Sequence, residues 1–161
     1  MKTVWMSCLG LTACLLATGA LAQTRYAVST SQLEVTDART GLIWRRCPEG
    51  MTATGGTCGG SASTFTHEAA LRHAAAQASS TGLTWRLPNV KELSSITDKS
   101  RSLPAIDTAA FPATPSNWFW SSSPYVNDAN NAWYVNFNYG SPYYLSGRSL
   151  ASHVRLVRAG Q

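Results

Sequence analysis

Tyrosine, asparagine and arginine side chains gather between residues 125 and 148. Tyrosine offers a flat, rigid contact with a polar tip, and asparagine offers adaptable hydrogen-bond donors and acceptors. Arginine can hold a carboxylate or a sulfate through two parallel hydrogen bonds. This combination is typical of a surface that binds a ligand. The candidate ligand-binding residues are Tyr125, Asn127, Asn130, Asn131, Tyr134, Asn136, Asn138, Tyr143, Tyr144 and Arg148.

Residues 133–139 alternate in a way that predicts which side chains face solvent. A period of two that is closed by Gly140 is typical of a half-buried antiparallel strand. We expect the inner face to hold Trp133, Val135, Phe137 and Tyr139, and the outer face to hold Tyr134, Asn136 and Asn138. We also expect Trp85 and Trp120 in the core. The alternative is that Tyr134, Tyr143 and Tyr144 pack on the core while the asparagines occupy turns.

No catalytic constellation is visible in the sequence. The Gly-x-Ser-x-Gly pattern that presents the serine of many hydrolases does not occur, and His67, His73 and His153 are isolated from one another. The eight acids are dispersed, with no pair that the sequence places across a cleft. We therefore expect no enzyme activity, no catalytic residue and no cofactor. A hydrolase that the sequence does not reveal is the third alternative.

The cysteines and the oxygen-bearing side chains do not predict a metal site. Asn127 and Asp128 are the nearest approach to a calcium ligand set, and a surface turn explains them better. Cys47 and Cys58 lack a second pair of ligands at the spacing of a zinc site. A disulfide between Cys47 and Cys58 is therefore favoured, which would stabilise the fold by about 2–3 kcal/mol.

The elements that position the candidate surface can be placed from local signals. Apolar residues on either side of a turn at residues 36–41 predict a hairpin. Thr66 can cap a helix that ends at Gly82, and a second helix can begin at Asn89 with Glu92 completing a capping box. His73 falls off the apolar stripe of the first helix, so we expect it in solvent.

The first 22 residues have the features of a signal peptide: Lys2, an apolar run, and small residues before Gln23. The alternative is a lipoprotein anchored through Cys14. The remaining residues, 23–161, have the length of a single domain, and we expect no transmembrane segment among them. The net charge of +5 comes from scattered arginines, a pattern that does not indicate nucleic-acid binding.

Five short motifs occur in a characteristic order along most of the chain. They are TDARTGLIW at 36–44, WRLPNVKEL at 85–93, WSS at 120–122, AWYVNF at 132–137 and VRLVR at 154–158. This series resembles the bacterial domain family typified by the C-terminal domain of the Legionella collagen-like adhesin. The resemblance implies an α+β, C-type-lectin-like fold, with two helices packed on twisted antiparallel strands and long loops, which the formylglycine-generating enzymes share.

The resemblance also implies a secreted or surface-exposed binding module. In the named adhesin it implies recognition of sulfated glycans by a trimer, so a homo-oligomer is among the expected assemblies. Formylglycine generation is not carried over, because the chain has no cysteine after Cys58. The calcium-binding sugar motifs of C-type lectins are absent as well.

The C-terminal segment is also similar to the variable proteins of diversity-generating retroelements, which display changeable ligand-contact residues on this fold. The matching display positions are Asn127, Asn130, Asn131, Asn136, Asn138, Tyr139, Tyr143, Tyr144, Ser146 and Arg148.

Together these observations predict an exported, non-catalytic domain of the periplasm or the cell surface. Its partner would be a glycan, including an anionic one, or another ligand of the cell envelope. The leading alternative is a protein-interaction or assembly module of the envelope.

Overall fold

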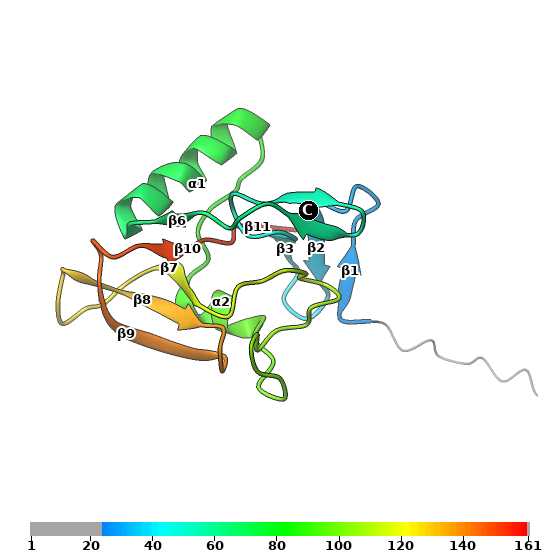
Figure 1. Ribbon diagram of the computed structural model, residues 1–161. Coiled ribbons are helices and arrows are strands. Elements are labelled where there is room, and N and C mark those ends of the chain that lie inside the picture. The colour runs from blue at the N-terminus through cyan, green and yellow to red at the C-terminus, as the bar shows by residue number, and fades with distance from the viewer. Residues whose placement is uncertain (1–23, 161) are drawn as a thin grey trace, which may run out of the picture.

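The computed structural model describes residues 24–160 and contains two helices and mostly antiparallel sheets (Figure 1). The α+β fold that the sequence predicts is confirmed. The predicted signal peptide and the alternative lipid-anchor residue, Cys14, lie outside the described residues. Within residues 24–160, neither helix has the length and apolar character needed to cross a membrane.

The first sheet joins the two ends of the domain. It has four strands in the order β1-β2-β3-β11, and its neighbours are antiparallel. The last strand pairs with β3, where Val157 lies opposite Trp44. The bounds are Tyr26–Val28 for β1, Glu34–Asp37 for β2, Leu42–Arg45 for β3 and Val157–Ala159 for β11.

The second sheet carries the C-terminal third of the chain. It has five strands in the order β6-β10-β7-β8-β9, so β9 forms one edge. Register shifts interrupt the pairing of β7 with β8 and of β8 with β9. The bounds are Thr64–Phe65 for β6, Ser152–His153 for β10, Trp118–Pro124 for β7, Asn131–Asn136 for β8 and Ser141–Gly147 for β9.

A small hairpin forms in the segment of chain that connects β3 to β6. It consists of β4 (Thr52–Thr54) and β5 (Thr57–Gly59). Cys58 in β5 is joined to Cys47 by the predicted disulfide, which is confirmed. The covalent link closes the loop that the sequence indicates, so a segment rich in glycine and threonine is tied to the end of β3.

Both helices begin where the capping signals predict. The first helix, α1 (His67–Thr81), is capped by the Thr66 side chain and ends at Gly82, whose left-handed backbone (φ 68°) suits glycine. The second helix, α2 (Val90–Ser95), begins at Asn89, and Glu92 completes the capping box.

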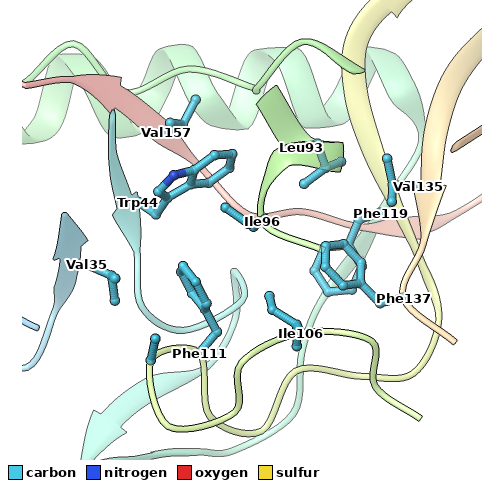
Figure 2. Close-up of a cluster of buried hydrophobic side chains, with 11 residues drawn as sticks. Val35, Trp44, Leu93, Ile96, Ile106, Phe111, Phe119, Val135, Phe137 and Val157 are labelled. Atoms are coloured by element: carbon cyan, nitrogen blue, oxygen red, sulfur yellow. The ribbon is translucent and has the colours of Figure 1, made fainter. Parts of the chain in front are cut away.

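Two hydrophobic clusters hold these layers together. One lies between α2 and both sheets, where Trp44, Phe111 and Phe119 come from three separate segments (Figure 2). The other lies under α1, where Ala70 and Ala74 pack close to Trp85 and Trp120. Small alanine side chains let the helix approach the sheet closely, so the tryptophan rings fill the remaining space.

Arg155 is a charged residue inside this core. Its side chain is fully buried and donates hydrogen bonds to the Arg45 carbonyl (2.8 Å), the Arg46 carbonyl and the Thr114 hydroxyl (2.7 Å). Its guanidinium also lies 5.0 Å from the centre of the Phe111 ring. Burial lowers the pKa of Arg155 to about 9, so the side chain stays charged at neutral pH.

Replacing Arg155 with methionine should lower the free energy of unfolding by about 3–5 kcal/mol, because two buried carbonyls and one hydroxyl would lose their charged donor. Urea unfolding followed by tryptophan fluorescence at neutral pH measures the change. Arg72→Met is the matched control, since the Arg72 side chain is 68% exposed, and should cost less than about 0.5 kcal/mol. Equal costs for the two variants would contradict the structural role of Arg155.

Candidate functional site

Seven aromatic rings make contact in series across β7, β8 and β9. We call this set the aromatic ladder; it consists of Trp118, Trp120, Tyr125, Trp133, Tyr134, Tyr143 and Tyr144. Cross-strand aromatic pairs of this kind stabilise a sheet and fix the orientation of each ring. The ladder is therefore a rigid feature of the second sheet.

The inner part of the ladder follows the strand register. Trp120 lies opposite Tyr134, and Tyr134 lies opposite Tyr143, so one ring comes from each of three adjacent strands. Trp118 lies beside this row, with its ring centre 4.4 Å from that of Tyr134 and 6.1 Å from that of Tyr143. At the inner end, His67 meets Trp120 edge-on at 5.2 Å.

The outer part of the ladder continues where the pairing of β8 with β9 is irregular. The rings of Tyr143 and Tyr144 are nearly parallel, with centres 6.1 Å apart. Tyr144 in turn stacks on Tyr125 at 4.4 Å and meets Trp133 edge-on at 5.2 Å. Since β9 is an edge strand, Tyr143 and Tyr144 lie at the open side of the sheet.

Exposure is lowest at the inner end of the ladder and highest at Tyr143 on the edge strand. Trp120 and Tyr134 are buried, Trp133 and Tyr144 are half-buried, and Tyr143 is 48% exposed. The buried rings hold the outer rings in place, so solvent meets a preorganised aromatic surface with phenol groups at its rim. Such a surface can bind a ligand by stacking and by hydrogen bonding.

The structure places Tyr125 and the asparagines before β8 at one end of the strands. The Asn127 amide donates to the Tyr125 hydroxyl (3.2 Å), and the Asn131 amide donates to Asp128 (2.7 Å). Asn130 is exposed, and its carbonyl accepts the backbone N–H of Arg148. These polar residues form a turn at the Tyr144 end of the ladder.

Asn136 and Asn138 lie at the other end of β8. The Asn136 side chain accepts the backbone N–H of Asn138 (2.7 Å), and the Asn138 carbonyl accepts the backbone N–H of Leu103. These hydrogen bonds form a structured turn, which agrees with the alternative interpretation of the sequence, that the asparagines occupy turns. The ten candidate residues are therefore divided between two ends of the sheet, with the tyrosines of β8 and β9 between them.

The face assignment made from alternation is wrong at three positions. Tyr134 is only 7% exposed, because the rings of Trp118 and Tyr143 cover it, and Tyr139 is 65% exposed. Trp133 is half-buried against Tyr125 instead of lying in the core. The strand ends at Asn136, so the period of two does not extend to residue 139, and each side of the sheet carries aromatic rings.

Arg148 lies in a shallow hollow between the end of β9 and the start of α1, which His67, Glu68 and Leu71 also line. Its Nε donates to the Asn131 carbonyl (3.2 Å), and its own carbonyl accepts the backbone N–H of His67. No carboxylate of residues 24–160 forms an ion pair with Arg148. Its remaining donors can therefore serve an anionic group.

His67 is a buried titratable residue at the inner end of the ladder. Its Nε2 lies 3.0 Å from the Ser121 carbonyl, and only 3% of the residue is exposed. Burial lowers the pKa of His67 below the usual 6.5, the hydrogen bond to Ser121 opposes this, and the charge of Arg148 lowers the pKa further. His67 is thus neutral at pH 7.

Local sequence signals missed one acid–histidine pair. His73 Nε2 lies 2.6 Å from a carboxylate oxygen of buried Glu49, with the Phe65 ring at 4.8 Å, so the expectation that His73 is solvated is wrong. The pair joins residues 24 positions apart, and only the packing of α1 on the loop brings them together. In the described part of the chain no hydroxyl hydrogen-bonds to this pair, and no group of three metal-binding side chains occurs.

Comparison with known protein families identifies a match. The family model described as the Lcl C-terminal domain covers residues 33–158. Neither a curated protein nor a solved structure matches the chain.

Acidification should weaken the fold through His67. The unfolded chain binds a proton near pH 6.5 and the folded chain only at lower pH, so the stability that neutral His67 contributes is complete above pH 6.5 and is lost as the pH falls below it. Between pH 7 and pH 5, urea unfolding of the wild type should show a loss of up to about 1.4 kcal/mol per pH unit beyond that of His67→Gln. Parallel pH profiles for the two proteins would show that His67 carries no such linkage.

Proposed function

Since this chain belongs to the Lcl C-terminal domain family, we propose that it is an adhesin-like, non-catalytic binding module whose ligand is a glycan held on the aromatic ladder. The observation that carries the proposal is the course of the ladder, from buried Trp120 to the exposed ring of Tyr143 on the edge strand β9. Because the side chains of this surface are already held in place, little conformational entropy is lost when a ligand binds.

The chemistry of a sugar fits such a surface. A pyranose ring has a face of C–H groups that can pack on a phenol or indole ring, and hydroxyl groups around its rim that can exchange hydrogen bonds with tyrosine and asparagine. Tyr143 and Tyr144 offer nearly parallel rings for adjoining sugar units. Tyr125, Asn127 and Asn130 add polar groups at the outer end.

Arg148 gives this surface a preference for anionic glycans. It lies on the turn side of the ladder, where its backbone is bonded to Asn130 and His67, and it has no carboxylate partner within residues 24–160. A guanidinium with free donors can hold a sulfate or a carboxylate. The contribution of Arg148 should fall as the salt concentration rises.

Export to the envelope agrees with this role. The Cys47–Cys58 disulfide fits an oxidising compartment, as does an adhesin-like family. We infer that residues 1–22 are a signal peptide and that residues 23–161 are a single domain of the periplasm or the cell surface.

A protein-interaction or assembly module is the second candidate. The observation that favours it is the position of β9 at the edge of the sheet, since an edge strand with exposed tyrosine can pair with another chain. Pro142 within β9 weighs against extended pairing, because proline has no backbone N–H to donate.

A glycan array probed at about 20 mM and about 150 mM salt tests the proposal. Binding should weaken about tenfold or more in Tyr143→Ala, which removes a ring that contacts Trp118, Tyr134 and Tyr144. Tyr139→Ala is the matched control, because Tyr139 is also exposed but lies outside the ladder, and it should change the affinity less than twofold. Arg148→Gln should flatten the salt dependence.

Equal losses of affinity in Tyr143→Ala and Tyr139→Ala would show that the aromatic ladder is not the binding surface. If no glycan binds while a purified envelope protein binds the wild type and the Tyr139 variant but not the Tyr143 variant, the assembly module is the correct function.

A further inference from the structure

A second hollow is lined by the start of β1 and by the segment that follows α2. In Figure 1, β1 lies on the opposite side of the molecule from β8 and β9, which carry much of the aromatic ladder. The hollow is open to solvent and has a volume of about 590 Å³, which is within the size range of small-molecule sites. Its walls come from the start of β1, the β2–β3 turn, residues 97–99 and residues 107–110. We call it the basic hollow; its charged and aromatic lining residues are Arg25, Tyr26, Arg39, Asp98, Lys99 and Asp107.

Two guanidinium groups of the basic hollow converge on one acceptor. The Ser95 carbonyl accepts a hydrogen bond from Arg25 (2.6 Å) and another from Arg39 (2.5 Å). Arg25 is neutralised by Asp37, to which it donates two hydrogen bonds (3.0 and 2.8 Å). The side chain of Arg39 forms no ion pair with any described residue, so its charge stays uncompensated beside that of Arg25.

Lys99 adds a second free cation. It is exposed, and no described residue forms a salt bridge with it. The two acids on the rim are already engaged: Asp98 accepts hydrogen bonds from Ser100 and Arg101, and Asp107 caps the backbone N–H groups that follow it. The donors that remain for a ligand are thus mainly on positively charged groups.

Tyr26 lines the hollow beside Arg25 and carries an unsatisfied hydroxyl group. The hydroxyl oxygen of Tyr26 is buried and has no hydrogen-bond partner, while the Arg25 guanidinium lies 4.5 Å from the centre of the Tyr26 ring. Burial raises the pKa of Tyr26 to about 12, so the hydroxyl keeps its proton. The Tyr26 ring therefore helps to hold the Arg25 guanidinium in position at the hollow.

We propose that the basic hollow is a second binding site, which takes a small ligand through an oxyanion group such as a carboxylate or a sulfate. Arg39 and Lys99 hold the oxyanion by charge-assisted hydrogen bonds, and Arg25, anchored by Asp37, sets the position of the Arg39 side chain through the shared Ser95 carbonyl. This site is separate from the aromatic ladder and does not depend on the glycan function proposed above.

Titration of the isotope-labelled protein with D-glucuronate, inorganic sulfate and D-glucose, followed by NMR, tests the site. At least one of the two oxyanions should cause saturable shifts in the backbone amides of Tyr26, Arg39 and Lys99, and glucose should not. The dissociation constant should rise about tenfold or more in Arg39→Gln and in Lys99→Gln. The comparison of glucuronate with sulfate shows whether the site favours a planar or a tetrahedral oxyanion.

Lys91→Gln is the matched control, because it removes one charge from an exposed lysine of α2 that does not line the hollow, and it should change the dissociation constant less than twofold. Equal effects of all three substitutions would mean that only net charge matters, and this result overturns the site. Shifts with glucose equal to those with glucuronate, or no saturable shift with either oxyanion, overturn it as well.

Discussion

The hydrogen bonds of Arg155 are the constraint on which the position of the last segment of the chain depends. This residue lies between β10 and β11, and its guanidinium reaches the carbonyls at the end of β3 and a hydroxyl in the loop before β7. One charged group thus ties the last segment of the chain to the first sheet and to the loop that leads into the second. Burying this charge is costly unless most of its donors are bonded, so the three acceptors and the Phe111 ring must keep their positions together.

The aromatic ladder extends this rigidity to the surface. Its inner rings belong to the hydrophobic cluster under α1, and Tyr143 and Tyr144 lie on the edge strand. The same contacts that stabilise the sheet therefore position the rings that can meet a ligand. For this reason Trp120 and Tyr134 are as important to the proposed surface as the exposed Tyr143, although neither is accessible.

Local chemistry made much of the fold predictable from the sequence. Thr66, Gly82 and the Asn89–Glu92 capping box act within a few residues, so both helices begin where their signals predict, and the short Cys47–Cys58 loop made the disulfide foreseeable. The candidate surface was only partly predictable, because the register shifts in β7, β8 and β9 break the period of two on which the face assignment relied. The Glu49–His73 pair and the basic hollow arise from packing between distant segments, for which the sequence carries no local signal.

The placement of the chain ends has a consequence for how the domain can be mounted. The described residues begin beside β1 and finish with β11, both in the first sheet, while β9 lies at the far side of the second (Figure 1). A tether joined to either end would therefore leave the tyrosine-bearing edge pointing away from its support. In such a geometry the point of attachment and the candidate binding edge lie at opposite ends of the domain.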